Sequence, residues 1–88
     1  MTQHYFKDIL RTGEELYFDL FREELEKSFW GQYAVIDIDR KEYVVNQNQL
    51  AALDEAKAKF GKKLFYSIRV GNIDRPTFDR IPQHAWIF

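Results

Sequence analysis

The fold is decided by residues 31–46, which read GQYAVIDIDRKEYVVN. Residues 32–39 alternate between two faces, as the side chains of a β-strand do. Polar residues 39–41 resemble a turn, and residues 42–46 form a second β-rich run. Two such runs joined by a short polar turn predict a β-hairpin. In the first run, one face carries Tyr33, Val35 and Asp37, and the other carries Ala34, Ile36 and Ile38.

Apolar residues at helical spacing precede the hairpin. Residues 3–11 predict a short helical segment that ends before Gly13. Thr12 is followed three residues later by Glu15, which matches a capping box at the start of a helix. We therefore expect the main helix to span residues 13–29. Its apolar stripe consists of Tyr17, Phe18, Phe21, Leu25 and Phe29, and Leu16 and Leu20 fall outside that stripe.

A second helix and a third strand are expected after the hairpin. Residues 49–60 are rich in helix formers, with Asn48 suited to cap the start of the helix and Gly61 suited to end it. Residues 64–70 alternate again as a strand, and residues 77–81 are compatible with a short fourth strand at the edge.

The predicted fold class is α+β: an N-terminal helix or helix pair, a β-hairpin, a helix, a third strand and a short edge strand. The helices are expected on one face of a small, mainly antiparallel sheet. The length of 88 residues predicts a single domain over residues 1–88, with a ββαβ core at 31–71 and an apolar C-terminal extension at 73–88. The predicted core positions are Phe21, Ile36, Leu53 and Ile68.

Composition excludes several kinds of function. The chain has no cysteine, which rules out disulfides, thiolate metal sites and cysteine nucleophiles. Its formal charge of −1 produces no general attraction to nucleic acid or to anionic membranes. No apolar run is long enough to span a membrane, and residues 1–8 lack the pattern of a secretory signal. We therefore expect a cytoplasmic protein.

Few residues have the spacing that catalysis or metal binding requires. Asp37 and Asp39 lie two apart, so on a strand both carboxylates would share a face and could hold a divalent cation or share a proton. Solvation and turn capping are the simpler roles, because no third ligand lies at a suitable spacing. His4 and His84 are the only histidines, and no serine lies in a nucleophile motif. We predict no enzyme, no metal site, no cofactor and no small-molecule substrate.

The aromatic content and the apolar end of the sequence indicate a protein partner. Aromatic residues make up 17% of the chain, and large rings both fill small cores and anchor interfaces. Residues 86–88 are too apolar for a free tail, so we expect them to be buried on this domain's own sheet, in a partner or in a symmetric dimer. Our leading hypothesis is a non-enzymatic interaction module that docks on a larger partner or on itself. The candidate contact residues are Phe78, Ile81, Trp86, Ile87, Phe88, Leu16 and Leu20.

The alternative hypothesis is a weak nucleic-acid-binding domain. Tyr33, Tyr43 and Phe65 could stack on bases. Against this, residues 64–71 lack the aromatic-glycine signature of RNA-recognition sheets, and the acidic main helix would repel phosphates. The basic residues of this surface are Lys57, Lys59, Lys62, Lys63 and Arg69.

The segment at 31–71 resembles a group of uncharacterised small bacterial proteins. The shared pattern is glycine, aromatic, Val-Ala-Ile-Asp, a turn, Glu-Tyr, a helix and Phe-Tyr-x-x-Arg-x-Gly; here its parts lie at 31–39, 42–45 and 64–71. The resemblance implies a stand-alone bacterial domain that is antitoxin-like or an accessory binding partner. It implies no activity and no site residues.

Overall fold

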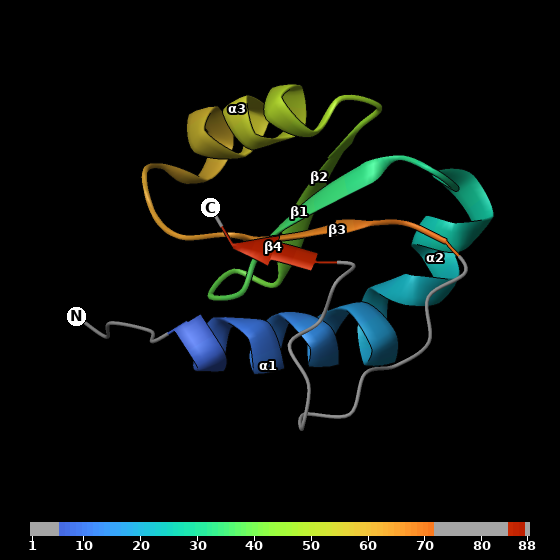
Figure 1. The fold of residues 1–88 in the computed structure, drawn as a ribbon, viewed down its shortest axis with the longest axis horizontal. Helices are drawn as coiled ribbons and strands as arrows, with labels where there is room; N and C mark the ends of the chain where they lie inside the picture. The colour runs from blue at the N-terminus through green and yellow to red at the C-terminus, as the bar shows by residue number, and fades with distance from the viewer. Residues whose placement is uncertain (1–5, 72–84, 88) are drawn as a thin grey trace.

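The computed structural model describes residues 6–71 and 85–87, in which helices lie on both sides of a four-stranded sheet (Figure 1). The helical elements are α1 (Phe6–Leu16), η1, a single turn of π-helix (Tyr17–Phe21), α2 (Arg22–Ser28) and α3 (Gln49–Phe60). The strands are β1 (Tyr33–Asp37), β2 (Glu42–Asn46), β3 (Tyr66–Arg69) and β4 (Ala85–Ile87).

The sheet is antiparallel throughout and has the order β2-β1-β3-β4. Val35 of β1 lies opposite Val44 of β2 and, on its other side, opposite Ser67 of β3. The α+β class, the hairpin and the third strand are thus confirmed. A fourth strand pairs with β3, with Trp86 opposite Ser67. The predicted edge strand at 77–81 lies outside the described residues.

The prediction that all helices cover one face of the sheet is wrong. The N-terminal helices pack against one face and α3 packs against the other, as Figure 1 shows. The reason is that buried apolar side chains lie on both faces at the centre of the sheet. Ile36 and Ile68 point toward the N-terminal helices, whereas Val35 and Phe65 point toward α3. Each apolar face must be buried, so each has its own helical layer.

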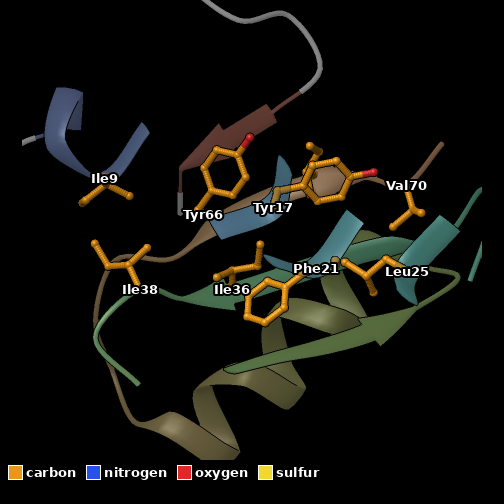
Figure 2. Close-up of a cluster of buried hydrophobic side chains, with 10 residues drawn as sticks. Ile9, Tyr17, Phe21, Leu25, Ile36, Ile38, Tyr66 and Val70 are labelled. Carbon is orange, nitrogen blue, oxygen red and sulfur yellow. The ribbon is translucent and has the colours of Figure 1, made fainter. Parts of the chain in front are cut away.

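The first hydrophobic cluster joins the N-terminal helices to the sheet (Figure 2). In the second cluster, α3 covers Val35 and Phe65. The four predicted core positions are all buried, so that prediction is confirmed. Three of them share the first cluster, and only Leu53 lies in the second. The members of the first cluster are Ile9, Tyr17, Phe21, Leu25, Ala34, Ile36, Ile38, Tyr66, Ile68 and Val70.

The predicted helix start at Thr12 is also wrong, because α1 continues through this residue to Leu16. Gly13 is a packing position in the middle of the helix. A Cβ at this residue would lie 2.2 Å from Cγ of Tyr66 on β3. The missing side chain therefore lets α1 approach the sheet closely enough to contact the Tyr66 ring.

The π-helical turn η1 follows α1 without a break and leads directly into α2. An α-helix has 3.6 residues per turn, so side chains four residues apart do not lie directly above one another; each is shifted around the helix axis by a little more than a full turn. A π turn contains one residue more than an α turn, so side chains four residues apart in it are shifted around the axis in the opposite direction. Tyr17, Phe21 and Leu25 are consequently all buried in the first cluster.

The ends of α3 match the prediction. The side chain of Asn48 accepts a hydrogen bond from the Ala51 amide at 3.0 Å, as an N-cap does. Gly61 ends the helix with φ of 90°, a backbone conformation that favours glycine.

Residues 85–87 fold back onto the domain's own sheet, which is the first of the arrangements expected for the apolar chain end. Ile87 lies opposite Tyr66 and packs against the first cluster. The main chain of Trp86 belongs to β4, while its side chain lies outside the described residues.

Candidate functional site

Within residues 6–71 and 85–87, no strand pairs with the outer edge of β2, which presents a row of main-chain groups. The pattern of hydrogen bonds in the central strand β1 shows which groups these are. The Val70 amide donates to the Gln32 carbonyl at 2.8 Å, one position beyond the paired residues of β1 and β3. In an antiparallel ladder, hydrogen-bonded and non-hydrogen-bonded pairs alternate. Ala34 and Ile36 therefore direct their main-chain groups to β3, and Val35 directs its groups to β2.

The same alternation continues into β2. Val44 lies opposite Val35 and bonds to it, so its main-chain groups point into the sheet. Tyr43 and Val45, one residue to each side, direct their N–H and C=O groups away from β1. Among the described strands, β2 is the outermost on this side. An edge of this kind is a template on which another strand can pair.

The side chains of the edge are half-buried and largely apolar. Tyr43 and Val45 pack at the margin of the first cluster, and Val44 packs at the margin of the second. The Phe21 ring meets Tyr43 edge-on, with centroids 5.0 Å apart. Burial, and then the neighbouring Glu24 carboxylate, raise the pKa of the Tyr43 hydroxyl above its usual value. Natural edges are often blunted by lysine, proline or a bulge. Residues 42–46 contain no lysine and no proline.

Polar contacts hold the far end of β2. The Asn46 side-chain amide donates to the Glu55 carboxylate on α3 at 2.8 Å. The Asn46 carbonyl oxygen Oδ1 also accepts from the Asn48 amide at 2.9 Å, which fixes the turn into α3.

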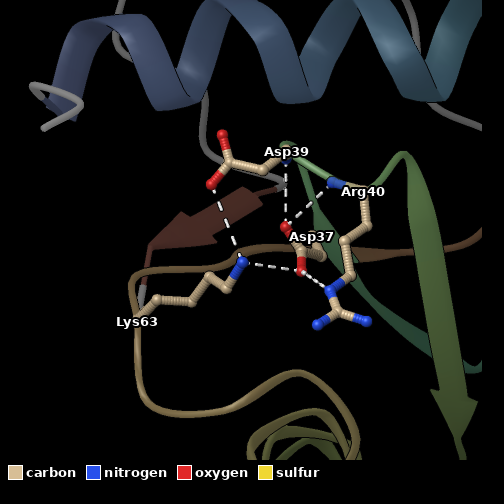
Figure 3. A network of polar contacts seen from close by, with 4 residues as sticks. All are labelled: Asp37, Asp39, Arg40 and Lys63. Carbon is tan, nitrogen blue, oxygen red and sulfur yellow. Dashed lines mark hydrogen bonds and ion pairs between the residues drawn. The ribbon is translucent and has the colours of Figure 1, made fainter. Parts of the chain in front are cut away.

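The near end of β2 is held by a network around Asp37 (Figure 3). The Asp37 side chain is fully buried at the end of β1, and its Oδ1 accepts from the amides of Asp39 at 3.0 Å and Arg40 at 3.3 Å. The Lys63 ammonium lies 2.8 Å from Asp37 Oδ2 and 3.7 Å from Asp39 Oδ2. Polar contacts therefore anchor both ends of the edge strand.

Asp37 and Asp39, considered above as a cation site or a proton-sharing pair, are joined here through Lys63. The lysine ammonium occupies the place between the carboxylates where a metal ion would have to bind. Asp37 caps the hairpin loop, and Asp39 lies exposed in that loop. In the described part of the chain, no group of three or more histidine, cysteine or acidic side chains could hold a metal ion.

We expect Asp37→Ala to destabilise the protein by about 1–3 kcal/mol, because the loop amides lose their acceptor and Lys63 loses its buried partner. Asp39→Ala is the matched control, and it should cost about 0.5 kcal/mol or less, since the Asp39 side chain is exposed to solvent. Urea unfolding at neutral pH measures both variants. Equal losses in the two variants would show that Asp37 does not hold the loop.

A buried polar group in the first cluster was missed at the level of sequence. Glu14 on α1 is only 1% exposed. It lies next to Tyr66, a member of the first cluster. Burial, followed by the charge of Glu14, raises the pKa of Tyr66 far above its usual value. Burial is also the main reason why the pKa of Tyr17 is raised. The signal was present in the sequence, since Glu14 lies seven residues before Phe21 and eleven before Leu25, on the same helical stripe.

These tyrosines predict a loss of stability at alkaline pH. Below about pH 10, tyrosine is neutral in both the unfolded and the folded state, so stability does not depend on its titration. Above that pH the unfolded chain releases protons that folded Tyr66 and Tyr17 retain, so the free energy of unfolding falls as pH rises. The slope is about 1.4 kcal/mol per pH unit for each proton that the folded state retains and the unfolded state has released.

Tyr66→Phe should make this alkaline slope shallower by about one proton. Denaturant unfolding at a series of pH values from 8 upward measures the slope, and the value at the lowest pH serves as the reference for each protein. The same slope in the variant and the parent would contradict the assignment of Tyr66.

Of the residues predicted to contact a partner, the structure describes the side chains of Leu16, Leu20 and Ile87. Leu16 and Ile87 pack against the first cluster, whereas Leu20 on η1 is 59% exposed. Phe78, Ile81 and Phe88 lie outside the described residues. The sequence prediction also missed the β2 edge, because it placed Tyr43 to Val45 in a hairpin strand without fixing the strand order. Other exposed large apolar side chains are Trp30, Leu50 and Leu64.

Four of the basic residues of the alternative hypothesis lie at or just after the end of α3, and the fifth lies on β3. Lys57 and Lys59 are exposed on α3, and Lys62 is exposed after it. Lys63 is engaged with Asp37, and Arg69 lies at the other end of β3. The structure therefore joins one of these five groups to a buried carboxylate.

Comparison with models of known protein families, with curated proteins and with solved structures finds no match to this chain. The resemblance at 31–71 to small bacterial proteins stays a prediction. Within residues 6–71 and 85–87, no helix is both long enough and apolar enough to cross a membrane.

Proposed function

We propose that this protein is a non-enzymatic interaction module that binds a protein through the open edge of β2. The observation that supports this proposal is the edge itself. Tyr43 and Val45 direct main-chain donors and acceptors outward from the terminal strand of the sheet. A partner strand that adds to such an edge gains affinity from main-chain hydrogen bonds and specificity from alternate side chains.

The surroundings of β2 fit this role. Tyr43, Val44 and Val45 are half-buried, so a partner strand would complete the burial of their apolar surface. The Asp37 network at one end and the Asn46 contacts at the other hold the strand in place. Such preorganisation reduces the conformational entropy that binding must overcome.

Val45→Pro tests the proposal, because proline removes an amide that points outward and leaves the ladder to β1 intact. Val45→Thr is the matched control, since it keeps the amide and the β-branched shape. The parent and both variants serve as affinity baits in native cell extract at low salt, with nuclease present. We expect the parent and Val45→Thr to retain the same partner and Val45→Pro to lose it.

The proposal is overturned if Val45→Pro, shown to be folded by circular dichroism, retains every protein that the parent retains. It is also overturned if the parent retains no protein and does not associate with itself. A partner that the parent retains in a parallel extract without nuclease, but not in the extract with nuclease, would instead favour the basic surface on α3 and β3.

A further inference from the structure

We infer that the strand added to β2 is β2 of a second copy of this chain, in an antiparallel pair about a two-fold axis through Val44. This inference rests on the proposed function and names its partner. The result would be a continuous eight-stranded sheet with the order β4-β3-β1-β2-β2-β1-β3-β4, in which β2 is no longer an edge.

The direction of the main-chain groups selects this register. An antiparallel pair centred on Val44 places Tyr43 opposite Val45 of the second copy, and Val45 opposite Tyr43. These are the residues whose N–H and C=O groups point outward, so both pairs form the hydrogen-bonded type. Val44, whose own groups are used by β1, falls opposite itself as a non-hydrogen-bonded pair, which needs no further main-chain partner.

The side chains in this register are also compatible. Tyr43 meets Val45, and aromatic residues opposite β-branched residues stabilise antiparallel pairs. Glu42 meets Asn46 of the second copy, so a carboxylate lies opposite an amide that can donate to it. No like charges are placed opposite one another between residues 42 and 46. A strand that paired with itself through two glutamates or two lysines would be repelled.

α3 lies on one face of the strands next to the β2 edge and does not pair with the edge itself. α3 packs over both β1 and β2, and its Phe60 reaches the Phe65 ring just before β3, with centroids 6.2 Å apart. The helix therefore covers the face formed by β1 and β2.

The absence of cysteine from the chain allows a direct cross-linking test of the register. In a non-hydrogen-bonded antiparallel pair the Cα atoms are about 4.5 Å apart, which lies within the range of a disulfide. Val44→Cys should therefore give a disulfide-linked dimer under mild oxidation. Val45→Cys is the matched control. In this register the two residues at position 45 are diagonal neighbours rather than directly opposite, so cross-linking should be several-fold slower. Equal rates for the two variants would overturn the register.

A charge test asks separately whether the partner is a second copy. Val44→Lys and Val44→Glu each place two like charges at the two-fold axis, so each variant alone should sediment with the chain mass of 10.6 kDa. An equal mixture should recover the doubled mass of the parent, because lysine then faces glutamate. Val44→Thr should stay dimeric. A parent that is monomeric over a micromolar concentration series would overturn the inference, as would a mixture that stays monomeric although both variants are folded.

These outcomes can be distinguished from a failure of the proposed function. Suppose that the parent is monomeric but retains another protein, and that Val45→Pro loses this protein. The inference of a second copy is then wrong, and the β2 edge remains the proposed binding surface. If neither self-association nor edge-dependent capture is found, both proposals fail together.

Discussion

Phe21→Ala is expected to lower the free energy of unfolding by about 3–5 kcal/mol, the range for aromatic truncations in protein cores. Phe21 lies on η1 and reaches the first cluster, where its ring also supports Tyr43 of the edge strand. Small domains have a total stability of about 5–15 kcal/mol, so this variant should be close to unfolding. Thermal melting followed by circular dichroism measures the effect.

Leu20→Ala is the matched control for Phe21→Ala, because Leu20 is its neighbour on the same π turn and points to solvent. This variant should change the free energy of unfolding by no more than about 0.5 kcal/mol. Similar losses in the two variants would mean that the face of η1 that carries Phe21 is not the one that packs in the core.

Gly13→Ala should destabilise the protein by about 2–3 kcal/mol, although alanine normally favours a helix. The gain in helix propensity is about 1 kcal/mol. It is outweighed because the new Cβ would lie 2.2–2.7 Å from the Tyr66 ring and Cβ. Tyr66 is fully buried in β3 and its Cβ is fixed by the backbone, so α1 would have to move away from the sheet.

Thr12→Ala provides the control for Gly13→Ala and also tests where the helix begins. Thr12 lies inside α1, so alanine there should be neutral or slightly stabilising. If Thr12 instead capped a helix that starts at Gly13, the same change would cost about 0.5–2 kcal/mol. Denaturant unfolding of both variants decides between the two arrangements.

Much of the fold follows from local patterns in the sequence. The alternation in β1 and β2 predicts the hairpin, and Asn48 and Gly61 predict the ends of α3, because strand period and helix caps depend on neighbouring residues only. The burial of Ile36 and Ile68 was predicted for the same reason.

The features that sequence reasoning missed depend on contacts between distant residues. Gly13 is read as a helix breaker unless Tyr66, 53 positions later, is known to pack against it. Glu14 is read as one of a run of solvated acids, although it lies beside Tyr66 in the core. The placement of α3 on the second face follows from the burial of Val35 and Phe65, which a strand pattern does not reveal until the strand order is known.

The candidate site was missed for a related reason. The sequence shows that Tyr43 to Val45 form a strand, but only the order β2-β1-β3-β4 shows that this strand is at the edge. The sequence analysis placed the partner surface mainly at the apolar chain end instead. Residues 85–87 of that end pair with β3.

Amide hydrogen exchange along β2 tests the central claim most directly, namely that this edge is open and binds a strand. In the dilute protein, the Val44 amide should exchange slowly because it bonds to β1, while the Tyr43 and Val45 amides should exchange rapidly. As concentration rises, or when the captured partner is added, Tyr43 and Val45 should become protected and Val44 should change little. Tyr43 and Val45 amides that exchange at the same rapid rate under all of these conditions would contradict the account.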